Sequence, residues 1–256
     1  MISLTKIISL FLLSTSVLFA GTTDPLTNDE KYVEYGAKFH YVLNLCGLSE
    51  DNKLFCASAV AIEPQWILTA AHVVKDAKHC GVHVKDSIVI LSDEIITHKD
   101  FDGSFGIGDI ALCHLTKPLE LNFYPLLYDT EDEVGKIACI SGYGLTGTFL
   151  EGQKISDGKK RAGSNIVDSI TGDLLICTPS RTVKEGRTEL EFIIASGDSG
   201  GGLFIDGKLA GINSCVFAEG KLPKSQYGDE AGHTRVSKYV GWIKEIIEQR
   251  KNKVDK

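Results

Sequence analysis

The chain has 256 residues, of which 43% are hydrophobic and 24% are charged, and its formal net charge is −7. This hydrophobic content is enough for a packed core, and the lack of long charge blocks or low-complexity tracts argues against extended disorder. Because phosphate binding relies on clustered Lys and Arg, the negative charge argues against a nucleic-acid partner. The one basic cluster, residues 159–161, lies in a Gly-rich stretch and is interpreted as a solvated loop.

The first twenty residues have the pattern of a secretory leader. Lys6 is followed by an apolar run over residues 7–20, which is shorter than the ~20 residues that a membrane span needs. A charged start, a short apolar centre and the small Ala20 before Gly21 predict a signal peptide over residues 1–20. An uncleaved anchor and a buried helix are the alternatives. No second long apolar run follows, so the mature protein is not expected to insert stably into a membrane. We expect it to be secreted, either to the extracellular space or to the periplasm.

Short strand-like runs rich in Val and Ile dominate the rest of the chain, and Gly, Asp and Asn separate them. Asp206-Gly207 predicts a two-residue hairpin turn. One helix is predicted over residues 236–249, where apolar residues fall on one face. Many strands and one terminal helix predict an all-β architecture. The predicted strands are residues 39–45, 57–62, 87–91, 110–115, 136–140, 174–176, 190–194, 201–205 and 208–213.

Three short strings supply an imidazole, a carboxylate and a hydroxyl in separate parts of the chain. A serine hydroxyl is unreactive at neutral pH and needs a base to take its proton, and a carboxylate can hold that base in the right tautomer. The sequence therefore predicts Ser199 as nucleophile, His72 as general base and acid, and Asp109 as the group that orients the imidazole. The strings are Thr69-Ala70-Ala71-His72, Asp109-Ile110-Ala111-Leu112 and Gly197-Asp198-Ser199-Gly200-Gly201.

With these strings in the order His, Asp, Ser, the chain resembles the trypsin/chymotrypsin-like serine proteases from about Phe39 to the C-terminal helix. The resemblance implies two packed antiparallel six-stranded β-barrels with a C-terminal α-helix, and a catalytic site in the cleft between the barrels. His72 and Asp109 would come from the first barrel and Ser199 from the second, with the crossover near residues 117–128. The N–H groups of Gly197 and Ser199 would form an oxyanion hole.

Asp198 occupies the position of a family acid that is buried and pairs with an α-amino group released when a propeptide is cut. A buried carboxylate without a partner would cost several kcal/mol. The nearest match to an activation site is Lys31-Tyr32, which would make residues 21–31 a propeptide or N-terminal extension and residues 32–256 the protease domain. A mature start at Gly21 would rule that cut out. In the alternative, Asp198 pairs with a side chain and no zymogen exists.

The resemblance also points to the substrate-binding residues. Ile193, six residues before the nucleophile, stands where the family has the base of its specificity pocket, and Ser214-Cys215-Val216 stands where it has the wall. Ile193 offers no charge to a Lys or Arg side chain, and Val216 in place of the usual Gly narrows the entrance. We expect a preference for small or medium apolar side chains and no trypsin-like cleavage. The alternative is that Ile193 and Val216 are core residues and the pocket is built differently.

Seven cysteines leave at least one thiol free or paired outside the chain. Cys56 matches a family cysteine whose partner directly follows the catalytic His, but here Val73 follows His72. Cys80 is therefore the candidate partner of Cys56, and Cys46 is its rival. No Cys-x-x-Cys pair occurs, so a zinc site is not expected. The resemblance to serine proteases implies an enzyme that needs no cofactor.

Together these features predict a secreted serine endopeptidase that hydrolyses peptide bonds through an acyl-enzyme. The expected partner is a protein or peptide substrate, and the expected state is a monomer. The leading alternative is a catalytically silent homologue that binds proteins. An esterase of another fold is a third reading, but in such enzymes Ser precedes His in the chain, and here the order is reversed.

Overall fold

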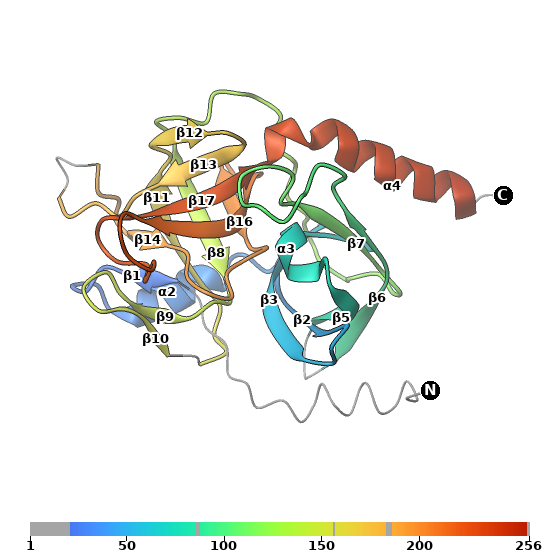
Figure 1. Cartoon of the computed structure of the whole chain (residues 1–256), viewed down its shortest axis with the longest axis horizontal. Helices are drawn as coiled ribbons and strands as arrows, with labels where there is room; N and C mark the ends of the chain where they lie inside the picture. The colour runs from blue at the N-terminus through green and yellow to red at the C-terminus, as the bar shows by residue number, and fades with distance from the viewer. Residues whose placement is uncertain (1–20, 85–87, 156, 183–185, 255–256) are drawn as a thin grey trace.

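The computed structural model describes residues 21–84, 88–155, 157–182 and 186–254, and it shows two β-rich halves packed side by side (Figure 1). The N-terminal half is a closed barrel with the strand order β2-β3-β4-β7-β6-β5, which we call the N-terminal barrel. This confirms the predicted all-β architecture and the first six-stranded barrel. Its strands are β2 (Val42–Ser49), β3 (Leu54–Glu63), β4 (Trp66–Thr69), β5 (Ala77–His83), β6 (Val89–Thr97) and β7 (Ala111–Leu115).

The C-terminal half, which we call the C-terminal lobe, contains more strands than the six expected. A seven-stranded sheet has the order β11-β8-β15-β16-β17-β13-β12, and a four-stranded sheet has the order β10-β9-β1-β14. The large sheet comprises β8 (Ile137–Gly142), β11 (Arg161–Ile166), β12 (Ser169–Thr171), β13 (Leu174–Cys177), β15 (Gly202–Ile205), β16 (Lys208–Ala218) and β17 (Asp229–Arg235). The small sheet comprises β1 (Thr22–Thr23), β9 (Thr146–Thr148), β10 (Gly152–Ile155) and β14 (Phe192–Ile193).

The apolar core explains why the two halves form one body. The larger cluster fills the N-terminal barrel with side chains such as Leu45 and Leu68, and it continues onto Phe204 and Ile212 of the C-terminal lobe. A second cluster lies inside the lobe itself. Each fully buried Leu or Ile contributes about 1.5–3 kcal/mol relative to exposure. The barrel and the lobe are therefore held together by apolar contacts as well as by the chain between β7 and β8.

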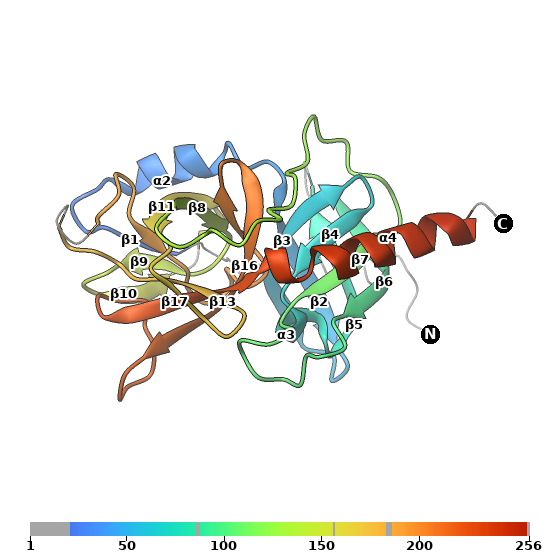
Figure 2. The same cartoon turned by 90° about the horizontal axis from the view of Figure 1, so that it is seen from above.

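The predicted C-terminal helix is present as α4 (Val240–Val254), preceded by a 3-10 turn, η3 (Val236–Lys238). From the lobe, α4 runs outward across the N-terminal barrel (Figure 2). Its apolar face buries Ile243 and Ile247, and Lys251 pairs with Glu63 of β3 at 3.2 Å. The helix thus extends from the lobe and packs against the N-terminal barrel, which connects the two halves. In the described part of the chain, no helix is long and apolar enough to cross a membrane.

Two local features bear on the sequence predictions. The turn at Asp206-Gly207 is confirmed, because Ile205 faces Lys208 across the β15–β16 hairpin and both turn residues have positive φ. The helix α2 (Asp29–Gly36) was not predicted; it is capped by Asn28, whose side chain accepts from the N–H of Glu30. This helix lies in the segment that the sequence suggested as a propeptide.

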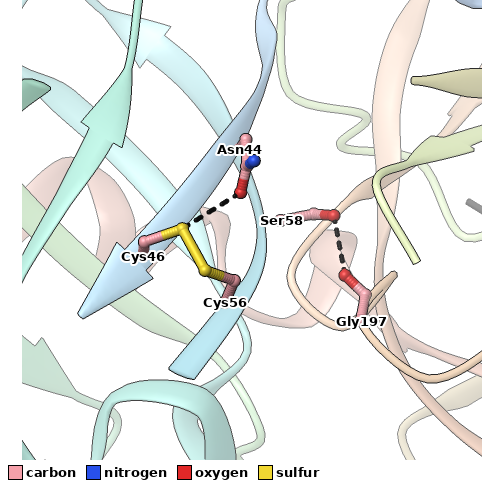
Figure 3. The surroundings of a disulfide bond; sticks show 5 residues. All are labelled: Asn44, Cys46, Cys56, Ser58 and Gly197. Carbon is pink, nitrogen blue, oxygen red and sulfur yellow. Dashed lines mark hydrogen bonds between the residues drawn. A yellow bond between two sulfur atoms is a disulfide. The ribbon is translucent and has the colours of Figure 1, made fainter. Parts of the chain in front are cut away.

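The predicted Cys56–Cys80 pairing is wrong, because Cys56 forms a disulfide with Cys46 (Figure 3). Cys46 and Cys56 lie directly opposite each other on β2 and β3, with Cα atoms 4.1 Å apart. Cys80 lies on β5, at the other edge of β2, where it faces Gly47 and is buried as a free thiol. The register of β2 against β3 therefore determines that Cys56 pairs with Cys46 and not with Cys80.

Candidate active site

The candidate site contains a hydrogen-bonded pair of His72 and Asp109. His72 lies in α3 (Ala71–Val74), a single turn after β4, and Asp109 lies two residues before β7. The distance from Nδ1 of His72 to Oδ2 of Asp109 is 2.8 Å, and the backbone N–H of His72 donates to Oδ1 at 2.9 Å. An ionised carboxylate only accepts hydrogen bonds, so Nδ1 carries the proton and Nε2 is free to act as a base.

Asp109 is fully buried and is also held from the C-terminal lobe. Ser214 Oγ donates to its Oδ2 at 2.5 Å, and Thr234 Oγ1 donates to its backbone oxygen at 2.9 Å. Burial by itself raises the pKa of Asp109. The hydrogen bonds from His72 and Ser214, together with the electrostatic attraction of His72, outweigh burial and leave the pKa below its usual value. The acid is therefore ionised at neutral pH, as an imidazole partner requires.

Ser199 lies in the loop of residues 194–201, which we call the Ser199 loop, and it shares a cavity with His72. This cavity has a volume of about 250 Å³. The Ser199 hydroxyl lies 3.5 Å from the backbone oxygen of Ser214, and the ring of Phe105 meets the ring of His72 edge to face. The structure therefore brings the predicted hydroxyl and imidazole to one concave surface at the junction of barrel and lobe.

Glycine is required twice in the Ser199 loop. Gly197 has a φ of +93° and Gly200 a φ of +84°, a region that side chains disfavour. A Cβ on Gly200 would also overlap the Thr69 hydroxyl and the backbone oxygen of Ser58. At Gly200 the loop therefore approaches the N-terminal barrel through backbone atoms.

Asp198 points away from the cavity into the lobe and is fully buried. Its carboxylate accepts hydrogen bonds from the backbone N–H groups of Gly21 at 2.7 Å, Gly144 at 2.8 Å and Ala195 at 2.8 Å. Burial raises the pKa of Asp198 to about 7 against the lowering effect of these bonds. The carboxylate thus connects the start of the Ser199 loop, at Ala195, to Gly21 and Gly144 outside the loop.

Sequence reasoning missed Ser58, which holds the Ser199 loop from the barrel side. Its hydroxyl donates to the backbone oxygen of Gly197 at 3.0 Å (Figure 3) and accepts from the N–H of Tyr143 at 2.9 Å. Its own N–H donates to the backbone oxygen of Ser199 at 2.9 Å. The only sequence signal was a polar residue inside the apolar run of β3.

Three of the four predicted pocket residues line the cavity: Ser214, Cys215 and Val216. Ile193 does not, because β14 turns its side chain into the core of the lobe, where it is fully buried. This corrects the sequence-based assignment. Its neighbour Ile194 lines the cavity instead, with Ala195, Pro223 and Ser225. The described residues that line this cavity include no Asp or Glu.

A metal site would need at least three acidic, His or Cys side chains close together. Among the residues that the structure describes, no three of them gather in a way that could hold a metal ion. The cavity is lined by His72, which is paired with Asp109, and by Ser199.

Comparison with known proteins gives consistent matches. A family model described as Trypsin matches residues 37–243. Serine protease SSP1 of Scolopendra subspinipes is 30% identical over 212 residues, which cover 72% of this chain and 70% of that protein. Trypsin of Sus scrofa is 29% identical, covering 75% of this chain and 85% of that protein. The solved structure of HL collagenase has a TM-score of 0.66 at 23% identity, covering 83% of this chain and 95% of that one, and shows the fold.

Proposed function

Because the chain belongs to the trypsin family of serine proteases, we propose that it is an active serine endopeptidase with Ser199 as its nucleophile. Family membership supports a peptidase. The observation that supports activity most directly is the hydrogen bond of 2.8 Å between His72 and the buried Asp109, in the wall of a cavity that also contains Ser199. A homologue that only binds proteins would have no need for a buried acid beneath this imidazole.

In the proposed mechanism, Ser199 Oγ attacks the scissile carbonyl carbon while Nε2 of His72 takes the hydroxyl proton. Asp109 stabilises the imidazolium that forms. The N–H groups of Gly197 and Ser199 donate to the oxyanion of the tetrahedral intermediate, and each such donor is worth about 3 kcal/mol. The intermediate collapses as the C–N bond breaks and His72 gives its proton to the leaving amine. Water, activated by His72, then hydrolyses the acyl-enzyme.

We propose a preference for small or medium apolar side chains before the scissile bond. Ile194 and Val216 give the cavity apolar walls, and no carboxylate among its described lining residues could compensate a Lys or Arg side chain. Burying a cation there would cost more than it gains. The cavity volume of about 250 Å³ also favours a small substrate side chain, because part of this volume is the space next to His72 and Ser199.

The proposed setting is outside the cytoplasm, with proteins or peptides as substrates and the protease acting as a monomer. The signal peptide that supports this setting spans residues 1–20 and lies outside the described residues. The Cys46–Cys56 disulfide supports it as well, because disulfides persist in oxidising compartments.

A fluorophosphonate probe tests the proposal, because it reacts only with an activated serine. The mature protein should be labelled once per chain, Ser199→Ala should not be labelled, and Asp109→Asn should lose roughly 10⁴-fold in kcat. Ser49→Ala, at the partly exposed end of β2, is the matched control and should be labelled like the wild type. A folded, mature protein that resists the probe and cleaves no peptide would show that the catalytically silent alternative is right.

A further inference from the structure

The basic cluster of residues 159–161 is not the solvated loop that the sequence suggested. Lys159 is exposed, and its ammonium nitrogen lies 3.9 Å from a carboxylate oxygen of Glu30. Arg161 is buried at the start of β11 and binds two carboxylates. Lys160, between them, is half-buried, and it forms no ion pair with any described residue. The cluster therefore contains one partly buried cation without a counter-charge.

Backbone oxygens hold the ammonium group of Lys160. Its Nζ donates to the backbone oxygen of Phe39 at 2.6 Å and to that of Val42 at 3.0 Å, and it lies 5.6 Å from the centre of the Tyr143 ring. An ammonium group has three N–H donors, so one remains for a further acceptor. Burial lowers the pKa of Lys160 to about 8, because these surroundings stabilise the charged form less well than water does.

Lys160 lies in the wall of a cavity of about 650 Å³, which we call the Lys160 cavity. This volume falls within the range of about 300–1,000 Å³ that is typical of small-molecule sites. The Lys160 cavity shares no described lining residue with the candidate active-site cavity, so the two are separate sites. Its walls are mainly apolar and include Val42, Leu43, Val84, Ile90, Leu119 and Leu121.

The charged groups of the wall favour a ligand with a single negative charge. Lys160 is the only Lys or Arg among the described lining residues. Glu120 is the only carboxylate among them, and it is exposed and does not pair with Lys160. The other polar side chains are His40, Asn44 and His83, and burial lowers the pKa of His83. A monoanion with an apolar body would match one ammonium group among apolar walls.

We propose that the Lys160 cavity binds a free aliphatic monocarboxylate, whose carboxylate pairs with Lys160 and whose hydrocarbon chain packs against the apolar walls. The third N–H of the ammonium group would supply a charge-assisted hydrogen bond, and burial of the chain would add a hydrophobic contribution. A peptide terminus fits less well, because its amide groups would need partners and Lys160 already engages the oxygens of Phe39 and Val42. The inference does not depend on the proposed function.

Calorimetric titration of the mature protein with sodium octanoate near neutral pH tests the proposal. We expect a Kd below about 1 mM. Octanamide has the same chain without the charge and should bind at least about 10-fold more weakly, because it loses the ion pair. Acetate keeps the charge without the chain and should bind at least about 100-fold more weakly, because each buried CH₂ group contributes to affinity.

Two lysine variants locate the binding site. Lys160→Gln should weaken octanoate binding by at least about 10-fold, because the amide cannot form the ion pair, and it should leave octanamide binding nearly unchanged. Lys159→Gln is the matched control, since it removes the exposed neighbouring charge and should keep the wild-type affinity for octanoate. Octanoate that occupied the candidate active-site cavity instead would bind equally well to both variants.

Three results would overturn the inference: equal affinity of the wild type for octanoate and octanamide, unchanged octanoate binding in Lys160→Gln, or tighter binding of the dipeptide acetyl-Ala-Leu than of octanoate. The last result would assign the Lys160 cavity to peptide C-termini. The comparison of octanoate with octanamide uses the wild type, so it decides the matter even where Lys160→Gln fails to fold. Calorimetry needs no catalysis, so the outcome is independent of the labelling of Ser199.

Discussion

The hydroxyl group of Ser58 donates a hydrogen bond of 3.0 Å to the backbone oxygen of Gly197, and this bond ties the N-terminal barrel to the Ser199 loop (Figure 3). The same hydroxyl accepts from the N–H of Tyr143 in the lobe. With Asp198 holding the loop from the other side, the backbone of Gly197 is fixed from two directions. The direction of the Gly197 N–H group, which the proposed oxyanion hole needs, therefore depends on both Ser58 and Asp198.

Ser58→Ala should therefore lower kcat by about 10-fold with a smaller change in KM, because one buried hydrogen bond is worth roughly 1–2 kcal/mol and this one orients a group that acts in the transition state. Ser92→Ala is the control, since it removes a hydroxyl-to-carbonyl bond of 2.8 Å elsewhere in the same barrel. Steady-state kinetics on a peptide ester separates kcat from KM. A rise in KM alone would show that Ser58 shapes substrate binding and does not position the loop.

Val216→Gly should broaden the substrate preference, because the Val216 side chain lines the cavity. We expect the ratio of kcat/KM for Phe over Ala before the scissile bond to rise by about 10- to 100-fold, the range seen when a hydrophobic pocket gains or loses a few carbon atoms. Val216→Thr, of nearly the same shape, should keep the wild-type ratio. An unchanged ratio in Val216→Gly would show that another residue of the cavity limits the size of the substrate side chain.

The Cys46–Cys56 disulfide should stabilise the folded chain, because it restricts the unfolded ensemble. Replacing both residues by Ala should lower the free energy of unfolding by about 2–3 kcal/mol, and the variant should no longer respond to reductant. Cys80→Ala should keep the response, since Cys80 is a free thiol. Urea unfolding with and without dithiothreitol measures both effects. A Cys46→Ala protein that still loses stability in reductant would indicate a second disulfide.

Acid should destabilise the lobe through His233. This residue is fully buried on β17; its Nδ1 lies 2.9 Å from Oδ1 of Asn213, and its Nε2 has no partner among the described residues. Burial lowers the pKa of His233 to about 3, whereas an unfolded His titrates near 6.5. Between these values the unfolded chain binds the extra proton, so stability falls as pH drops from about 6.5 towards 3, by at most roughly 1.4 kcal/mol per pH unit.

His233→Gln should flatten this dependence while keeping a donor for Asn213. Urea midpoints at several pH values between 7 and 4 provide the measurement, and the slopes are compared because the substitution itself also costs stability. His79→Gln, at an exposed position of β5, should keep the wild-type slope. The same slope in His233→Gln would assign the acid sensitivity to other groups.

The sequence predicted those features that depend on a few neighbouring residues. The Asp206-Gly207 turn follows from backbone preferences of two residues, and α4 follows from an apolar face repeated over several turns. The roles of His72, Asp109 and Ser199 were assigned from three local strings. Their partners were not predictable in the same way, because Ser58 and Thr234 reach the site from distant strands.

Features that depend on register or on long-range contacts were missed or misassigned. Cys46 pairs with Cys56 because β2 and β3 align these residues, which a count of cysteines cannot reveal. The strand β1 is only two residues long and has no periodicity to detect. Helix α2 is short and is held by the ion pair between Asp29 and Arg161, two residues far apart in the sequence. Ile193 faces the core because of the direction in which β14 enters its sheet.

The hydroxyl groups of Ser214 and Thr234 both reach across from the lobe to Asp109. An isolated fragment that stopped at the end of β7 would lack both, and water would take their place around the acid. The N-terminal barrel grown alone would thus carry the imidazole and the carboxylate without the environment that sets their chemistry. Studies of this pair by fragment expression or by splitting the gene between β7 and β8 would report on a different, solvated pair of groups.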